Sequence, residues 1–336
     1  MEPGLAIAVV LAFVFAFTNG FHDESNSIAT LVATRAARPG PALALAVVFV
    51  FIGPLVLGSA VATTIAGLVD VSPSEMTAVV TAALVAALVW NLATWYLGLP
   101  SSSGHALVGG LVGAGIAEAG LDAVNWGGFD GWRPTGVIGV LVGLAISPVL
   151  GAVGALVVLR FLCRALRRGT QRFATPLLRA QWVASALLAT SRGANDGQKA
   201  VGLVAAVLLA NGSSSSLVAP TWVTLGAAGS IAVGTAFGGW RIVRTVGRRI
   251  FDLRPLDGLA SASASAAVIL GASFAGAPVS GTHVVASSVV GVGGGRRRWG
   301  RIRWTVVREM GIAWLTTIPA TALLAAVALG FWRWLT

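Results

Sequence analysis

Long apolar segments alternate with short polar ones along the whole chain. Several apolar segments reach about 18 residues or more, which lets a helix cross the ~30 Å hydrocarbon core of a bilayer. Their side chains do not alternate between apolar and polar, as those of membrane β-barrel strands do. Because lipid offers no partners to backbone N–H and C=O groups, this pattern predicts an all-α polytopic membrane protein.

The apolar segments form ten blocks, five in each half of the chain. The first half holds blocks at about 4–34, 41–69, 76–98, 104–119 and 135–160. The second half holds blocks at about 181–210, 218–240, 257–275, 279–294 and 305–332. Polar residues interrupt the first and sixth blocks, so we expect broken helices or re-entrant segments and about 10–12 transmembrane elements.

Two motifs of the first half recur in the second half. The stretch GFHDESNSIA at 20–29 resembles GANDGQKAVG at 193–202, and PSSSGHALVGGLVG at 100–113 resembles PVSGTHVVASSVVG at 278–291. Five crossings in each half is an odd number, so the second copy runs upside down relative to the first. Inverted-topology repeats are typical of secondary transporters, whose substrate site lies near the membrane midplane at the repeat interface. A passive channel is the alternative architecture.

Basic residues indicate which loops face the cytoplasm. The net charge is +11, and all but one of the 23 basic residues are arginines, mostly grouped between the apolar blocks. This distribution favours the positive-inside rule and contact with anionic lipid over binding to nucleic acid. It predicts a first inverted repeat at 1–162, a basic cytoplasmic linker at 163–180 and a second inverted repeat at 181–336. Both chain termini are expected outside the cell.

Asp23 and Asp196 occupy equivalent positions in the two repeats, inside apolar blocks. Only 10% of the residues are charged, and a charge at the membrane midplane costs at least ~2.5–3.5 kcal/mol, so such residues indicate function. Carboxylates at these positions bind a coupling cation or carry a proton. The alternative is a structural ion pair with Arg192 or Lys199.

The residues around the two aspartates are polar but differ between the repeats. The counterpart of Glu24 is Gly197, and the counterpart of Lys199 is Asn26. A cation near the midplane, such as Lys199 or Arg192, either attracts an anionic substrate or neutralises an aspartate. The roles of Glu24 and Arg192 stay open at this point.

The repeated proline–serine–histidine motifs are typical of helix starts. Ser102 and Ser280 match across the repeats and are good N-cap candidates. Free amides and the positive end of the helix dipole make such a start an anion site, and two facing starts suit a tetrahedral oxyanion. The alternative is two ordinary caps. His105 and His283 hydrogen-bond the loop, donate to the substrate or relay protons.

Together these motifs resemble the PiT family of inorganic phosphate transporters, specifically its short bacterial branch. The matching stretches are NGFHDESNSIAT (19–30), PSSSGH (100–105), GANDGQK (193–199), PVSGTH (278–283) and AWLTTIPATALLAA (313–326). The resemblance covers both halves and implies a symporter that carries inorganic phosphate into the cell with H⁺ or Na⁺ by alternating access. It also implies a multi-pass plasma-membrane protein, a homodimer, and no cofactor besides the coupling ion.

The repeats and the resemblance together assign residues to the site. The substrate-binding candidates are Ser102, Ser103, His105, Asn195, Gln198, Lys199, Ser280, Thr282 and His283. The cation-coupling candidates are Asp23, Asn26 and Asp196. If the coupling ion is Na⁺, the residues expected to hold it are Asp23, Asn26, Asn195 and Asp196.

Two glycines depart from the pattern of this family. Gly104 stands next to His105, and Gly281 stands where a threonine is usual, so each repeat has lost one hydroxyl. Backbone amides still bind an anion there, and glycine eases close approach. The choice of oxyanion is the property affected, so sulfate is the alternative substrate. A metal–phosphate complex is another form in which phosphate is carried.

Motifs for chemistry other than transport are missing from the sequence. The chain has no H-E-x-x-H zinc motif, no G-x-S-x-G nucleophile elbow and no histidine pair at i, i+4. We therefore expect that the protein is not an enzyme. Cys163 is the single cysteine, which excludes an internal disulfide. The first apolar block lacks the flanks of a cleaved signal peptide and is expected to remain as a helix.

Overall fold

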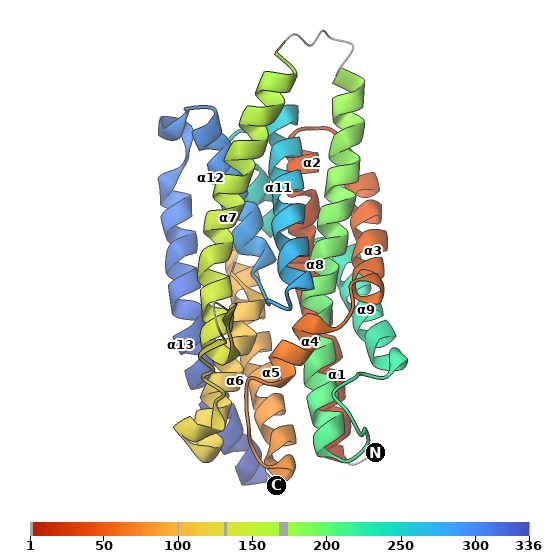
Figure 1. Ribbon diagram of the computed structural model, residues 1–336, viewed down its shortest axis with the longest axis vertical. Coiled ribbons are helices and arrows are strands. Elements are labelled where there is room, and N and C mark those ends of the chain that lie inside the picture. The colour runs from red at the N-terminus through yellow and green to blue at the C-terminus, as the bar shows by residue number, and fades with distance from the viewer. Residues whose placement is uncertain (1–2, 100, 131–132, 168–173, 336) are drawn as a thin grey trace.

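The computed structural model describes residues 3–99, 101–130, 133–167 and 174–335, and it is an all-α membrane protein (Figure 1). The helices of the first half are α1 (Pro3–His22), η1 (Glu24–Ile28), α2 (Ala29–Ala33), α3 (Pro39–Val56), α4 (Ala60–Ala66), α5 (Pro73–Leu97), α6 (Ser103–Ala119), η2 (Leu121–Ala123) and α7 (Gly136–Ala165). The helices of the second half are α8 (Ala174–Ala210), α9 (Thr221–Ala236), α10 (Trp240–Arg244), η4 (Thr245–Arg249), α11 (Pro255–Phe274), α12 (Gly281–Gly295), η5 (Trp299–Arg301) and α13 (Trp304–Leu335). Two very short antiparallel strands, β1 (Phe129–Asp130) and β2 (Arg133–Pro134), precede α7. Pro100 and residues 168–173 of the predicted linker lie outside the described residues.

Each predicted block corresponds to one helix or to consecutive helices. The predicted break in the first block is present, because α1 ends at His22 and a 3₁₀-helix follows. The predicted break in the sixth block is wrong, because α8 runs without interruption for 37 residues. Its polar residues Arg192, Asp196 and Lys199 share one helix face and are buried, so the backbone stays helical. In the first block the polar residues follow one another directly, so a continuous helix would not place them all on one face. The helix is interrupted there.

The two halves make the same contacts with their roles exchanged. α1 packs on α9 as α8 packs on α3, and α6 packs on α13 as α12 packs on α7. Figure 1 shows α5 and α6 towards the end that holds both chain termini, whereas α11 and α12 lie towards the opposite end. This exchange is the arrangement expected of two inverted repeats.

Helix length and apolar composition together single out the stretches that can span a membrane. In the described part of the chain, the stretches long and apolar enough to cross a membrane are Pro3–Ala33, Pro39–Val56, Pro73–Leu97, Gly136–Ala165, Pro255–Phe274 and Trp304–Leu335. Large apolar side chains on α13, such as Leu315 and Val327, point outward as lipid-facing residues do. α6 and α12 have 17 and 15 residues, which span only about 22–25 Å. Both begin at buried serines, so their starts lie inside the protein.

Glycines let the long helices of the two halves cross at backbone distance. A Cβ atom on Gly234 of α9 would lie 1.9 Å from the carbonyl oxygen of Phe17 on α1. At the mirrored crossing, a Cβ atom on Gly193 of α8 would lie 2.3 Å from the carbonyl oxygen of Val50 on α3. Gly193 opens the repeated GANDGQK motif, so this crossing presses the motif against the other half of the protein.

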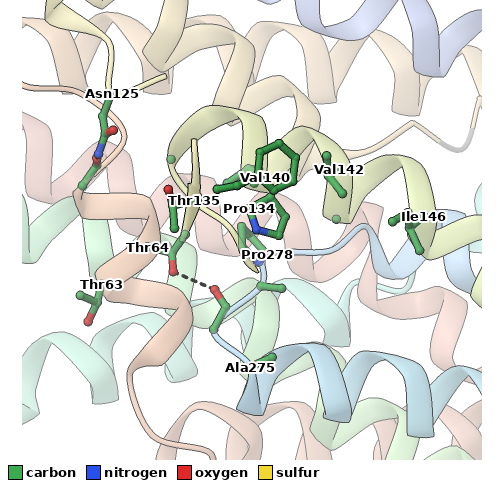
Figure 2. A pocket seen from close by; sticks show the side chains of 17 residues that line it. Thr63, Thr64, Asn125, Pro134, Thr135, Val140, Val142, Ile146, Ala275 and Pro278 are labelled. Atoms are coloured by element: carbon green, nitrogen blue, oxygen red, sulfur yellow. Dashed lines mark hydrogen bonds between the residues drawn. The ribbon is translucent and has the colours of Figure 1, made fainter. Parts of the chain in front are cut away.

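A groove of about 750 Å³ lies between α4, the start of α7 and the loop before α12 (Figure 2). Apolar side chains such as Val140 and Ile146 form much of its wall. Thr64 Oγ1 on α4 donates a hydrogen bond to the carbonyl oxygen of Gly276 at 2.7 Å and ties that loop to α4. Pro278, which also lines the groove, lies just before the start of α12.

Candidate functional site

The first repeat contributes a cluster of polar side chains at the end of α1 and in η1. Asp23 Oδ1 accepts a hydrogen bond from Thr282 Oγ1 of α12 at 2.7 Å and lies 2.9 Å from His22 Nδ1. Asn26 Nδ2 donates to the same Thr282 hydroxyl at 3.4 Å. All these side chains are buried. The predicted carboxylate of the first repeat therefore meets the helix start of the second repeat.

Asp196 is the mirrored carboxylate on α8, and a lysine lies beside it. Lys199 Nζ donates to Asp196 Oδ1 and, at 3.2 Å, to the carbonyl oxygen of Val279. A Cβ atom on Gly104 of α6 would lie 3.1 Å from this Nζ atom. The glycine at which the first repeat lost a hydroxyl thus leaves room for an ammonium group at the start of α6.

Ser102 and Ser280 cap the starts of α6 and α12, as the sequence predicts. Ser102 Oγ accepts a hydrogen bond from the His105 amide, and Ser280 Oγ accepts one from the His283 amide, each at 3.3 Å. Each serine hydroxyl keeps its own hydrogen for donation to another acceptor. Ser103 is buried in the first turn of α6. The two starts offer amides, hydroxyls and the positive ends of helix dipoles to an anion.

The two helix starts meet through their histidines. The ring centroids of His105 and His283 lie 4.6 Å apart, and His283 stacks on Trp314 of α13 at 3.7 Å. Among the described residues, His105 Nδ1 and His283 Nε2 find no hydrogen-bond partner, although both side chains are buried. Buried polar atoms normally have partners, so these nitrogens indicate a place for a polar ligand.

Arg192 joins the two carboxylate clusters. Its Nη2 donates to the carbonyl oxygen of Asp23 at 2.6 Å and lies 4.0 Å from Asp196 Oδ2. Its Nε donates to Glu24 Oε2 at 3.4 Å, across 168 positions of the chain. From the sequence, the roles of Glu24 and Arg192 stayed open. The i, i+4 spacing of Arg192 and Asp196 predicts that these two side chains are neighbours on one helix. No local spacing predicts the contact between Arg192 and Glu24.

Two predicted substrate residues, Asn195 and Gln198, hydrogen-bond segments around the site. Asn195 Nδ2 donates to Ser273 Oγ at 3.0 Å, and its Oδ1 accepts from the Val279 amide at 3.3 Å. Gln198 Oε1 accepts from the Val61 amide at the start of α4 at 2.9 Å. Both side chains brace loops that lead to the site. Of the four residues expected to hold Na⁺, Asp23 and Asn26 meet at Thr282, whereas the Asn195 side-chain oxygen accepts from the Val279 amide.

The first cluster brings oxygen-bearing side chains of both repeats together. Asp23 supplies a carboxylate and Thr282 a hydroxyl. Asn26 Oδ1 has no partner in the described part of the chain. Such oxygens near the midplane of inverted repeats suit Na⁺ or a proton. At Asp196, the Lys199 ammonium group already neutralises the carboxylate.

The site is a buried charge cluster with more carboxylates than cations. Each charged side chain in it is at most 4% exposed: Asp23, Glu24, Arg192, Asp196 and Lys199. Charges interact strongly in such surroundings because little water screens them. A phosphate anion would increase the negative excess unless a cation entered with it.

Comparison with known proteins agrees with this geometry. A family model described as the phosphate transporter family matches residues 19–178 and, a second time, residues 166–325. The chain belongs to the phosphate transporter family. The double match agrees with two repeats, and the resemblance to the PiT family that the motifs indicated is confirmed.

Relatives within the phosphate transporter family cover nearly the whole chain. A probable low-affinity inorganic phosphate transporter of Bacillus subtilis (strain 168) is 40% identical over 329 residues, covering 96% of this chain and 95% of the relative. A probable low-affinity inorganic phosphate transporter of Mycobacterium tuberculosis (strain ATCC 25618 / H37Rv) is 41% identical, covering 97% of this chain and 77% of the relative. A solved structure, the sodium-dependent phosphate transporter, has a TM-score of 0.86 and 27% identity, covering 99% of this chain and 100% of that one. These similarities support a role in transport rather than catalysis.

Proposed function

We propose that the protein is a secondary active symporter that brings inorganic phosphate into the cell together with H⁺ or Na⁺. The observation that carries this proposal is the meeting of two buried, capped helix starts, one from each repeat, through His105 and His283. Two starts directed at one place supply amides, hydroxyls and helix dipoles for a tetrahedral oxyanion. Family membership and the names of the relatives favour phosphate as that oxyanion.

The site residues take three kinds of role in this proposal. Direct phosphate contacts come from the helix starts and the ammonium group beside them: Ser102, Ser103, His105, Lys199, Ser280, Thr282 and His283. Cation coupling belongs to the polar residues of the other repeated motif: Asp23, Asn26 and Asp196. Asn195 and Gln198 act as positioning residues, because their side chains hold the loops before α12 and α4.

The charge of the site supports entry of a cation with the anion. The buried carboxylates already outnumber the buried cations, and phosphate adds at least one more negative charge. A sodium-dependent transporter of the same fold and the unpaired oxygen of Asn26 favour Na⁺. The lysine at Asp196 and the buried carboxyl group of Glu24 favour H⁺.

Alternating access between the two repeats completes the proposal. The groove beside the loop before α12 serves as the approach from the end that holds both termini, which we assign to the outside of the cell (Figure 2). The basic linker at 163–180 then faces the cytoplasm between repeats at 1–162 and 181–336. The resemblance to the PiT family favours a homodimer in the plasma membrane.

Uptake of labelled phosphate by proteoliposomes tests the proposed transport. We expect phosphate to accumulate above equilibrium under an inward H⁺ or Na⁺ gradient, and accumulation to stop when the gradient collapses. Replacing Na⁺ by choline at fixed pH, and then collapsing the pH gradient, identifies the coupling ion. Uptake that never exceeds equilibrium would contradict symport and favour a passive channel.

The same proteoliposomes test the form of the substrate. Labelled sulfate is offered alone and in competition with phosphate, and uptake of sulfate without phosphate would overturn the assignment of the substrate. Chelation of divalent metals distinguishes free phosphate from a metal–phosphate complex as the substrate. Uptake of the complex stops when the metal is chelated, whereas uptake of free phosphate continues.

Removal of the cap hydroxyl of α12 tests the helix start as a phosphate site. Ser280→Ala is expected to cost about 1 kcal/mol of stability. It should also weaken phosphate binding about 10-fold, because a donor to a charged ligand is lost. Ser72→Ala is the matched control, since Ser72 caps α5 away from the site. Thermal unfolding and phosphate binding measure both effects, and unchanged binding by Ser280→Ala would contradict the assignment.

A further inference from the structure

A second groove, of about 380 Å³, lies between α2, the start of α3 and α10. Apolar side chains such as Val32, Ala33 and Val243 form most of its wall, and Trp240 and Arg244 complete it. The described lining includes none of the residues proposed to contact phosphate or the coupling cation. The groove is therefore separate from the transport site.

The second groove lies at one boundary of the membrane. One apolar stretch long enough to cross a bilayer ends at Ala33 and the next begins at Pro39, and both of these residues line the groove. Figure 1 shows α2 towards the end of the molecule opposite both chain termini, which the proposed topology puts on the cytoplasmic side. Tryptophan is enriched at such boundaries because its indole ring is apolar and carries one polar N–H group. Trp240 therefore lies at the depth where lipid headgroups meet acyl chains.

Three arginines at or beside the second groove form no ion pair within the described part of the chain. Arg244 lines the groove and is exposed, and Arg35 and Arg38 lie in the short link between α2 and α3. The next acidic residues along the chain after Arg244, which are Asp252 and Asp257, pair with other arginines. The groove therefore combines an apolar wall with uncompensated positive charge.

The link between α2 and α3 is held against the rest of the protein. Trp182 Nε1 of α8 donates a hydrogen bond to the carbonyl oxygen of Ala36 at 3.1 Å, and the Ala36 amide donates to the carbonyl oxygen of Leu31 at 3.1 Å. These bonds fix the backbone of the link, in which Arg38 stands directly before the lining residue Pro39. α3 begins there without a side-chain cap, so the positive end of its dipole adds to the charge of the arginines.

We propose that the second groove binds an anionic phospholipid of the cytoplasmic leaflet. The guanidinium group of Arg244 donates to the headgroup phosphate, because its parallel N–H groups match two phosphate oxygens. An acyl chain lies against Val32, Ala33 and Val243, with Trp240 at the level of the glycerol group. Basic pockets between membrane helices on the cytoplasmic side bind anionic headgroups in this manner. This lipid site goes beyond the proposed transport of phosphate.

The wall of the second groove favours a lipid over free inorganic phosphate. Among its described side chains, only Trp240 and Arg244 carry an N–H group. A free phosphate against the apolar remainder of the wall would lose its water without gaining enough hydrogen bonds. A lipid avoids this cost, because its headgroup phosphate stays at the water boundary while its acyl chain covers the apolar residues.

Quenching of tryptophan fluorescence by lipids with brominated acyl chains tests the lipid site in the purified full chain. The protein is placed in phosphatidylcholine nanodiscs that contain a rising fraction of brominated phosphatidylglycerol or, in parallel, brominated phosphatidylcholine. The signal of Trp240 is the difference between wild type and Trp240→Phe. We expect half-quenching of this signal at a fraction of phosphatidylglycerol at least about 5-fold lower than that of phosphatidylcholine. Equal quenching by both lipids would overturn the proposal, and so would no quenching at all, the result expected if a second copy of this chain covers the groove.

Arg244→Gln tests the headgroup contact. We expect the preference of the Trp240 signal for phosphatidylglycerol to fall about 5-fold, because one guanidinium group near the membrane surface is lost. Arg164→Gln is the matched control, since Arg164 is an exposed arginine in the last turn of α7, which packs on α11 and α12. It should keep the wild-type preference. An unchanged preference in Arg244→Gln, or an equal loss in both variants, would refute a specific site and show only general attraction to a basic surface.

Competition with inorganic phosphate separates a lipid headgroup from a free anion. Phosphate is added to the quenched nanodiscs while chloride keeps the ionic strength constant. We expect no recovery of the Trp240 signal, whereas unbrominated phosphatidylglycerol should restore it. Recovery with inorganic phosphate would overturn the lipid assignment. Because quenching does not depend on transport, quenched protein that transports no phosphate would refute the proposed function and leave the lipid site standing.

Discussion

Asp23→Asn and Asp196→Asn are each expected to abolish cation-coupled phosphate uptake while the purified protein keeps its fold. Asparagine preserves the shape of the side chain but removes the charge that a coupling cation requires. Loss of a charged partner costs about 1.5–3 kcal/mol, or roughly 10–100-fold in cation affinity. Thr282 donates to Asp23 and keeps an acceptor in the asparagine oxygen, and Lys199 keeps its bond to the carbonyl oxygen of Val279. Uptake into proteoliposomes under a cation gradient measures the effect.

Asp252→Asn is the control for both aspartate variants. Its side chain is 88% exposed and pairs with Arg303 at the surface, so its loss should leave uptake unchanged. Thermal unfolding of all three variants separates a loss of coupling from a loss of structure. Wild-type uptake in both Asp23→Asn and Asp196→Asn would refute the assignment of the paired aspartates to the site.

Gly234→Ala is expected to destabilise the protein by at least about 3 kcal/mol, although alanine is the better helix former. The added Cβ atom would lie 1.9 Å from the carbonyl oxygen of Phe17, which is backbone and does not rotate away. Relief of this contact requires α9 and α1 to move apart along their crossing. We expect a lower melting temperature and a smaller monodisperse fraction in detergent.

Gly229→Ala, in the same helix α9, is the matched control. A Cβ atom there meets nothing within 4 Å. The substitution should therefore leave stability unchanged or raise it by about 0.5–1 kcal/mol, because alanine loses less backbone entropy than glycine. The two variants differ only in what the new methyl group contacts. A shift of the same sign and size in both would show that the α1–α9 crossing does not depend on Gly234.

The ten helical blocks and the two serine caps were predictable because they depend on neighbouring residues. A cap needs a hydroxyl a few positions before a helical run, and Ser102 and Ser280 meet that condition. The expected break in α8 was wrong because the prediction counted polar residues without considering the helix face they share. Arg192 and Lys199 lie on the buried face of an unbroken helix.

The duplicated motifs identified polar residues without identifying their partners. Asp23 and Thr282 meet as members of two such motifs, whereas Asn195 and Gln198 turn to the backbone of other segments. Each of these side chains has several donors or acceptors, and the helix packed beside it decides which are used. Sequence spacing within one motif carries no information about that neighbour.

The sequence alone determined that the chain crosses a membrane as two related halves with a duplicated polar motif. Hydrophobic length and the cost of a charge in lipid are properties of the residues themselves, so they can be read without a structure. Only the tertiary structure decided that His105 meets His283 and that Arg192 reaches Glu24. These contacts join residues far apart in the chain, and they depend on how closely the helices of one repeat pack against those of the other.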